Sequence, residues 1–397
     1  MMQGGEKPIR YPARWKANDP RVAWLAWGLL LLVLAALVLA GNRRTVTGNY
    51  REAALLWFRG GDIYTGTGVG FLYLPQAAIL FAPFAWLPVK LGEIAWRAIS
   101  VGSFAIGLRR YASLAGRESG AELFPLMTAL SLPLAFSCFR NGQSTVPIAA
   151  LMMIAVVDLA DRRWGRAAAW LSLGLALKPL VLVMTLLAGA LYKPMRGRLL
   201  AGTAIVLASP FLFQAPGYVV SQYQLCAASM QATARLGIDL YWAHFFGMLK
   251  VAGVSVSPSV QTGVRLLAAG GTLWLCRLAR KQYPADQAAV WLYALSACYL
   301  MLFNPRTENN TYAMLGPAIA VFCGQALLIE RRPMVAAALA GAAIGILGSH
   351  QITKGITPPS QSVWLSPLVC AGFLAFLVLT LTARKGGPAG AAGSAGS

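Results

Sequence analysis

The chain has 397 residues, of which 57% are hydrophobic and only 12% are charged, and its mean hydropathy is +0.60. A soluble chain of this length needs more charged surface, so the composition excludes a soluble globular protein. Because lipid cannot satisfy backbone hydrogen bonds, this composition predicts an all-α polytopic membrane protein. The net charge of +21 would suggest nucleic acid in a soluble protein, but here it indicates membrane topology and contact with membrane lipids.

Long apolar stretches, each near the ~20 residues that a helical crossing needs, fill most of the chain. The clearest are 22–40, 92–108, 122–137, 143–160, 263–279, 286–303, 311–329, 333–348 and 363–382. We expect one integral-membrane domain over 22–383, after a cytoplasmic segment 1–21 and before a flexible tail 384–397. Arg43 and Arg44, not a small-residue cleavage site, follow the first stretch, so we interpret it as a crossing and not a signal peptide.

Basic clusters lie at the ends of these stretches, including Arg10 to Arg21, Arg162-Arg163, Lys193 to Arg198, Arg277 to Lys281 and Arg331-Arg332. The positive-inside rule makes these clusters cytoplasmic. It predicts external loops at about 41–72, 215–262, 304–310 and 349–362. The count of crossings agrees only if the proline-rich segment 73–88 dips into the membrane without crossing it.

The stretch 166–192 has basic residues on both flanks and a Lys178-Pro179 pair near its centre. Because proline disfavours helical geometry in the preceding residue, the pattern predicts two half-length helices that meet at this pair. The fold class is then a bundle of about 11–13 transmembrane or re-entrant helices.

The first external loop contains an amphipathic pattern over Asn49 to Arg59. Its apolar or small residues Tyr50, Ala53, Ala54, Trp57 and Phe58 share one helical face. We expect a helix in the headgroup plane, with Trp57 and Phe58 as interfacial anchors.

Asp62 follows a glycine pair in the same loop and has two interpretations. It is either a turn aspartate that bonds its own backbone, or a carboxylate at the membrane rim that takes a proton from a sugar hydroxyl. Glu52 is the rival acid, and its simpler interpretation is an exposed helix charge beside Arg51 or Arg59.

Lys178 is the cation most deeply embedded in apolar sequence. Such a cation needs a partner or a wet cavity, unless it snorkels from a helix end. We interpret it as a ligand for a phosphate head group.

Two polar clusters begin apolar segments, Arg140 to Thr145 and Asn304 to Asn310. Helix capping explains Asn141, Thr145 or Thr307 on their own. It does not require Arg306, Glu308, Asn309 and Asn310 together, so this cluster is a candidate for binding a polar ligand. Neither the scattered cysteines nor the two histidines indicate a metal site.

The order of motifs along the chain resembles glycosyltransferase family 87, within the GT-C class of polytopic transferases, over about residues 22 to 350. The motifs are Gly61-Asp62-Ile63-Tyr64, Phe71-Leu72-Tyr73-Leu74-Pro75-Gln76, Leu80 to Pro88 with Trp96 downstream, Asn141-Gly142-Gln143, Gly174 to Pro179 and Asn304-Pro305-Arg306-Thr307-Glu308. The leaving group of a glycosyl transfer needs only charge stabilisation, so we expect no metal, and we expect no cofactor. The resemblance implies an inverting transferase. Its donor is a polyprenyl-phosphate sugar, typically mannose, and its active site faces away from the cytoplasm.

One departure from the family concerns the catalytic base. The family usually has an Asp a few residues before the tyrosine that matches Tyr50, but this chain has Val46 and Thr47 there. The base is therefore assigned among Asp62, Glu52 and Glu308, with Asp62 preferred because the glycines around it allow a close approach to a bound sugar. The family's late motif often ends in Glu-His-His, against Glu308-Asn309-Asn310 here.

The resulting hypothesis is a mannosyltransferase-like enzyme of a bacterial plasma membrane, acting on a lipid-linked or glycolipid acceptor at the outer face. We assign the donor phosphate to Lys178, Arg306, Arg43 and Arg44, and substrate binding to Tyr64, Tyr73, Asn141, Gln143, Asn309 and Asn310. A lipid or small-molecule transporter or flippase, and a catalytically inactive relative, are the alternatives.

Overall fold

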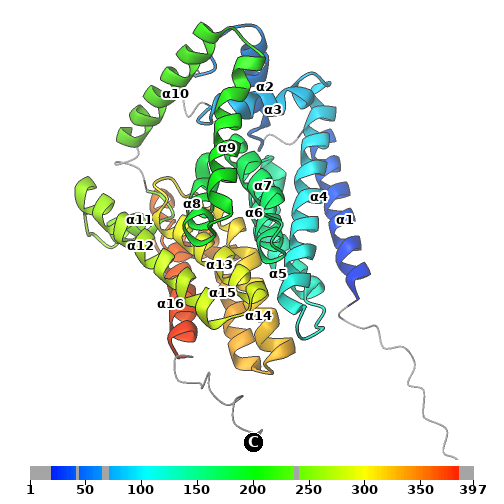
Figure 1. The fold of residues 1–397 in the computed structure, drawn as a ribbon, viewed down its shortest axis with the longest axis vertical. Helices are drawn as coiled ribbons and strands as arrows, with labels where there is room; N and C mark the ends of the chain where they lie inside the picture. The colour runs from blue at the N-terminus through cyan, green and yellow to red at the C-terminus, as the bar shows by residue number, and fades with distance from the viewer. Residues whose placement is uncertain (1–18, 42–43, 65–70, 237–240, 384–397) are drawn as a thin grey trace, which may run out of the picture.

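The computed structural model describes residues 19–41, 44–64, 71–236 and 241–383, and these residues form helices and loops without a β-strand among them (Figure 1). The α-helices are α1 Pro20–Leu39, α2 Thr47–Phe58, α3 Pro75–Ala85, α4 Val89–Gly116, α5 Phe124–Asn141, α6 Thr145–Ala160, α7 Trp164–Leu177, α8 Leu182–Leu191, α9 Met195–Ala208, α10 Pro216–Leu236, α11 Phe245–Val251, α12 Pro258–Gln282, α13 Ala285–Phe303, α14 Gly316–Gly324, α15 Pro333–Thr353 and α16 Leu365–Ala383. Short 3-10 turns lie at Pro179–Val181, Ser209–Leu212, Asn309–Met314 and Pro359–Gln361, and a π-helical turn at Gln325–Ile329.

Six helical segments of the described ranges are long and apolar enough to cross a membrane. They are Pro20–Leu39, Val89–Gly116, Ala285–Phe303, Asn309–Ile329, Pro333–Thr353 and Pro359–Ala383. Shorter apolar helices, such as Thr145–Ala160, complete the bundle. The predicted all-α polytopic class is confirmed.

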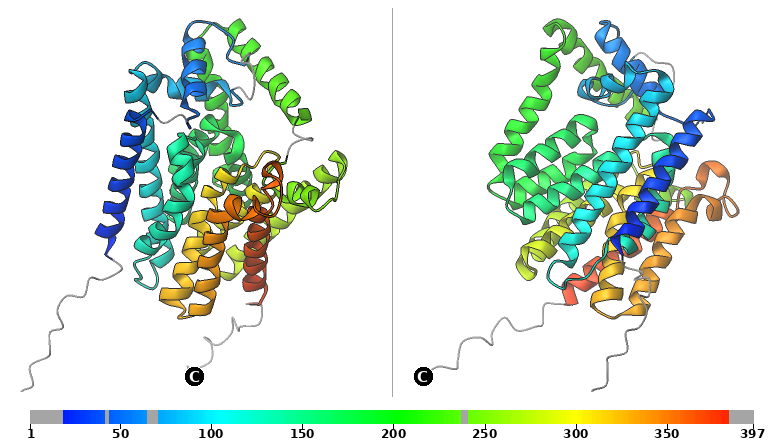
Figure 2. Two further views of the ribbon diagram at one scale, coloured as in Figure 1. Left: turned by 180° about the vertical axis from the view of Figure 1, so that it is seen from behind. Right: turned by 90° about the vertical axis from the view of Figure 1, so that its right-hand side faces the viewer.

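The bundle has two distinct ends. The end that we call upper carries α2 and α3, whereas the loop between α14 and α15 lies at the opposite, lower end (Figure 1). Arg117, just after α4, bonds Asp161 at 3.0 Å and Asp286 at 3.1 Å, which places the start of α7 and the start of α13 at the lower end as well. At the upper end, α10 begins beside α2 and slopes down along the outside of the bundle (Figure 2).

The predicted break at Lys178-Pro179 is confirmed. Lys178 has extended backbone angles, φ −163° and ψ 136°, between α7 and the turn at Pro179. The 14-residue α7 rises only about 21 Å, less than the ~30 Å hydrocarbon core. The rings of Trp164 and Tyr192, at the two far ends of the pair, lie 5.6 Å apart. Helices α7 and α8 therefore form a hairpin whose tip is Lys178-Pro179 and whose ends both return to the lower side.

The helix expected in the first loop forms, but its apolar face has a different partner. Trp57 is fully buried, and its ring lies 5.1 Å from that of Tyr218 in α10. Phe58 packs on Trp86 and Phe213. The expectation that Trp57 anchors α2 in lipid was wrong, because the hydrophobic face is covered by protein.

The most buried helix supports the upper loops from below. Every residue of α6 from Thr145 to Leu159 is buried, and α6 packs against α4, α7 and α13. Just before α6, helix α5 is capped by Gly142. The φ of Gly142, +66°, is the left-handed conformation that glycine adopts without strain. A Cβ at Gly142 would lie 2.6 Å from Cγ2 of Thr47, so this glycine also permits a close approach between α5 and the start of α2.

Gly142→Ala should destabilise the fold more than Gly120→Ala. Both glycines have positive φ, 66° and 68°, but a Cβ at Gly120 would meet nothing within 4 Å. Both variants share the conformational cost, and only Gly142→Ala adds overpacking of about 1–3 kcal/mol. Thermal unfolding in detergent measures the difference, and equal losses of stability would contradict the close packing at Gly142.

Candidate active site

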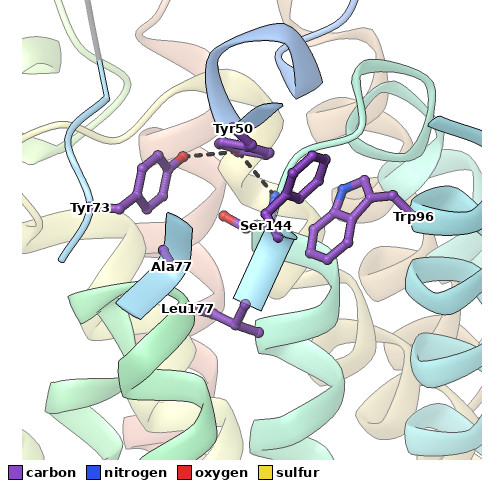
Figure 3. A pocket seen from close by; sticks show the side chains of 7 residues that line it. Tyr50, Tyr73, Ala77, Trp96, Ser144 and Leu177 are labelled. Atoms are coloured by element: carbon purple, nitrogen blue, oxygen red, sulfur yellow. Dashed lines mark hydrogen bonds between the residues drawn. The ribbon is translucent and has the colours of Figure 1, made fainter. Parts of the chain in front are cut away.

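A pair of tyrosines joins α2 to the loop before α3 at the upper end. The hydroxyls of Tyr50 and Tyr73 lie 3.0 Å apart, and the backbone N–H of Ser144 donates to the Tyr50 hydroxyl at 3.4 Å (Figure 3). Burial raises the pKa of Tyr50, and Tyr73 raises it further, so this phenol stays neutral at physiological pH.

A small pocket lies between this pair and the tip of the α7–α8 hairpin. Figure 3 shows Tyr50, Tyr73, Trp96 and Ser144 around it, with Leu177 beneath. The indole N–H of Trp96 donates to the carbonyl of Gly142 at 2.8 Å, which fixes the loop before α6. The Ser144 hydroxyl is buried and has no hydrogen-bond partner among the described residues. A buried polar atom of this kind is suited to accept a ligand contact.

Lys178 reaches this region from below. Its ammonium nitrogen lies 5.5 Å from the centre of the Tyr73 ring, a cation–π distance. The extended backbone at Lys178 places this cation at the tip of the hairpin instead of along a helix side. The side chain that the sequence singles out as a buried cation thus borders the tyrosine pair.

Arg306 lies in the loop after α13, within electrostatic range of Tyr73. Its guanidinium carbon lies 4.8 Å from the ring centre of Trp242. Burial lowers the pKa of Arg306, whereas the Glu308 carboxylate and the Tyr73 phenol raise it. Arginine remains charged despite such a shift. The positive charges of Lys178 and Arg306, which come from separate loops, are therefore both within electrostatic range of Tyr73.

Glu308 joins the loop after α13 to the loop after α5. Its carboxylate accepts a hydrogen bond from the side-chain amide of Gln143 at 3.2 Å and also caps the turn that begins at Asn309. The Cys138 thiol donates to Gln143 and to the carbonyl of Asn310, at 3.1 and 2.9 Å. Lys178 and Glu308 both act electrostatically on that thiol. The hydrogen bonds bring Gln143, Glu308 and Asn310 into one cluster, and Lys178 lies within electrostatic range of it.

Asp62 adopts the turn geometry that its simpler interpretation predicts. One carboxylate oxygen accepts the backbone N–H of Tyr64 at 2.8 Å. The Tyr64 hydroxyl in turn donates to the backbone carbonyl of Tyr73 at 2.8 Å. This hydrogen bond links the Asp62 turn to the tyrosine pair. Glu52 is exposed on α2.

The remaining described residues that the sequence predicts for the site lie at its margin. The amide of Asn309 donates to the carbonyl of Ser362 at 3.4 Å, and the side-chain oxygen of Asn141 is buried without a hydrogen-bond partner in the described part of the chain. Arg44 is exposed after α1, and Arg43 lies outside the described residues.

Sequence reasoning missed a fourth carboxylate at the upper end, that of Glu93 in α4. One of its oxygens accepts the hydroxyl of Thr47 at 3.0 Å, and the other accepts the guanidinium of Arg97 at 3.1 Å. Arg97 is only 1% exposed and also donates to Thr45 and to the carbonyl of Arg140, at 3.1 and 2.8 Å. The only signal in sequence is a Glu and an Arg four positions apart, which usually form a surface pair.

Comparison with known proteins identifies a family and one relative. The family model of glycosyltransferase family 87 matches residues 71–305, more than half of the chain, including Tyr73, Gln143 and Lys178. A protein of Mycobacterium tuberculosis, named polyprenol-phosphate-mannose-dependent alpha-(1-2)-phosphatidylinositol mannoside mannosyltransferase, is 26% identical over 385 residues, with 84% of each chain covered. The chain therefore belongs to glycosyltransferase family 87.

Proposed function

We propose that this enzyme transfers mannose from a polyprenyl-phosphate donor to a hydroxyl of a lipid-linked acceptor, with inversion at the sugar carbon. The observation that carries the proposal is that Lys178 lies 5.5 Å from the ring centre of Tyr73 and that Arg306 is within electrostatic range of the same tyrosine. Two cations from separate loops suit a phosphate group. The mycobacterial relative, whose name specifies a polyprenol-phosphate-mannose donor, supports the donor class.

The reaction needs three groups from the protein: a base for the acceptor, cations for the departing phosphate, and hydrogen-bonding groups for the sugar. The acceptor oxygen attacks C1 of the sugar, the bond from C1 to the phosphate oxygen breaks, and a carboxylate takes the hydroxyl proton. Lys178 and Arg306 stabilise the negative charge that grows on the departing phosphate. The Tyr50–Tyr73 pair and the unpartnered Ser144 hydroxyl offer hydrogen bonds to the sugar.

Glu308 is the carboxylate that we assign as the general base. It shares a loop with Arg306 and is held by Gln143, so a proton acceptor and the phosphate site lie side by side. Asp62, which the sequence favours, uses one oxygen to close its own turn and is the alternative. Substrates would enter from the upper end, which we assign to the outer face of a bacterial plasma membrane.

Glu308→Gln should lower turnover by about 10²–10⁴-fold, the usual effect of removing a general base. Its amide cannot accept the hydroxyl proton, whereas donor binding by Lys178 and Arg306 remains. Asp62→Asn is the matched control, because the asparagine oxygen can still accept the Tyr64 N–H, and its turnover should stay near the wild-type value. Initial rates of mannose transfer, with donor binding followed by Trp fluorescence, test both. A loss confined to Asp62→Asn would transfer the role to Asp62.

Lys178→Met and Arg306→Met should each weaken donor use by roughly tenfold to a hundredfold, because a charge-assisted contact contributes ~1.5–3 kcal/mol. Lys90→Met is a suitable control, since Lys90 is an exposed cation at the same end that donates to the carbonyl of Leu39. The dependence of rate on donor concentration is the measurement. Normal donor dependence in both variants would place the phosphate elsewhere.

Cysteines introduced at Arg59 and Pro305 should react with an impermeant thiol reagent in intact cells, and one at Glu118 should react only after lysis. All three positions are exposed, the first two at the upper end and the third at the lower end. The native cysteines are all buried, so background labelling is low. Labelling of Glu118→Cys alone would reverse the proposed orientation.

A further inference from the structure

A second cavity lies at the lower end of the bundle, opposite the candidate active site. It has a volume of about 570 Å³ and lies between the α6–α7 loop, the α8–α9 loop and the junction of α12 with α13. Its polar lining is basic, from Arg162, Lys193 and Arg280. No acidic side chain is among the described residues that line it.

Three acids on the elements around the cavity are paired with other arginines. The buried carboxylate of Asp158 pairs with Arg110 at 2.9 Å and with Arg166 at 3.3 Å. Asp161 and Asp286 both pair with Arg117. Within the described ranges, Arg162, Lys193 and Arg280 therefore have no carboxylate within 4.0 Å, although acids lie on the neighbouring helices. The cavity keeps an uncompensated positive charge.

Two of the cavity's elements are held in place by the fold. The Arg280 guanidinium lies 4.4 Å from the ring centre of Tyr192 and donates one hydrogen bond to the carbonyl of Leu191. A guanidinium has five N–H donors, so the others can serve a ligand. Trp164, whose ring is tilted 44° against that of Tyr192, and Tyr283 complete an aromatic wall of the type found where membrane meets water.

Arg162 occupies a position that favours glycine. Its φ is +58°, the left-handed region, and the turn is closed by the N–H of Arg163, which donates to the carbonyl of Asp158 at 2.7 Å. A non-glycine residue costs conformational energy there. The positive-inside rule explains a basic residue in this loop, and the turn places the Arg162 side chain in the lining of the cavity.

The flank of the cavity continues onto a face of α12 with exposed leucines. A shallower hollow that shares Arg280 is lined by Trp274, Arg277 and Lys281 of α12. Farther along α12, Leu266 and Leu267 are 68% and 78% exposed, as expected for side chains that face acyl chains. A headgroup in the cavity could thus continue into tails along α12.

We infer that this cavity binds the phosphate headgroup of an anionic phospholipid. The binding chemistry is charge-assisted hydrogen bonding from Arg162, Lys193 and Arg280, with the aromatic wall against the glycerol region. The site is separate from the mannosyl-transfer site, and its occupation does not depend on the identity of the donor or the acceptor.

The test uses the full-length protein in detergent, with cardiolipin as the probe and phosphatidylcholine and inorganic phosphate as comparisons. Binding is followed by native mass spectrometry and by the lipid-induced rise in unfolding temperature. Cardiolipin should bind and stabilise, and phosphatidylcholine should not. Equal effects of both lipids would overturn the inference, and phosphate binding as tight as cardiolipin binding would overturn the lipid assignment.

Two variants separate the cavity from general surface charge. Arg162→Gly combined with Lys193→Gln should weaken cardiolipin binding by about a hundredfold, roughly tenfold for each cation removed. Arg162→Gly also removes the left-handed strain, so the variant should fold at least as stably as the wild type without lipid. Arg196→Gln with Arg198→Gln, which removes two charges from neighbouring α9 outside the cavity, should bind normally. Equal weakening by the two double variants would show a diffuse electrostatic effect and refute the site.

Discussion

Irregular backbone inside a membrane protein is tolerated only where other protein groups or water can satisfy it, and this constraint organises the upper half of the structure. The chain leaves helical geometry at 142–144, at Lys178-Pro179 and at 304–308. These three breaks converge, through Ser144, Lys178 and Glu308, on the tyrosine pair and on Gln143. Each break frees polar groups, and their convergence makes a polar site at the upper end of the bundle.

The network behind this site is fixed by a single buried guanidinium. Arg97 bonds Glu93 in its own helix, Thr45 before α2 and the carbonyl of Arg140 at the end of α5. A buried charge of this kind is expensive to leave unpaired, so the three segments are held in one arrangement. Gly142 fits against the same arginine and Thr47, which explains why the loop that carries Ser144 cannot shift independently.

Sequence reasoning located elements and isolated charges better than partners. The amphipathic period predicted the helix at Thr47–Phe58 nearly to its ends, but the residue that covers Trp57 comes from α10, and no local pattern specifies such a distant contact. Lys178 was noticed because a cation in apolar sequence is costly without a partner, and Arg306 because helix capping does not explain its polar cluster. The Glu93–Arg97 pair was not, since its spacing is that of ordinary surface pairs and its burial depends on Thr47 and Arg140. The choice between Asp62 and Glu308 likewise depended on hydrogen bonds formed in the folded chain.

The hairpin of α7 and α8 has a consequence for the parity of the whole chain. Because its ends, marked by Trp164 and Tyr192, lie together, the hairpin adds length without changing the side on which the chain emerges. The first helix begins and the last helix ends at the same, lower end of the bundle (Figure 1). Reporter domains fused before α1 and after α16 would therefore lie on the same side of the membrane. The two domains could associate there without disturbing the helices between them.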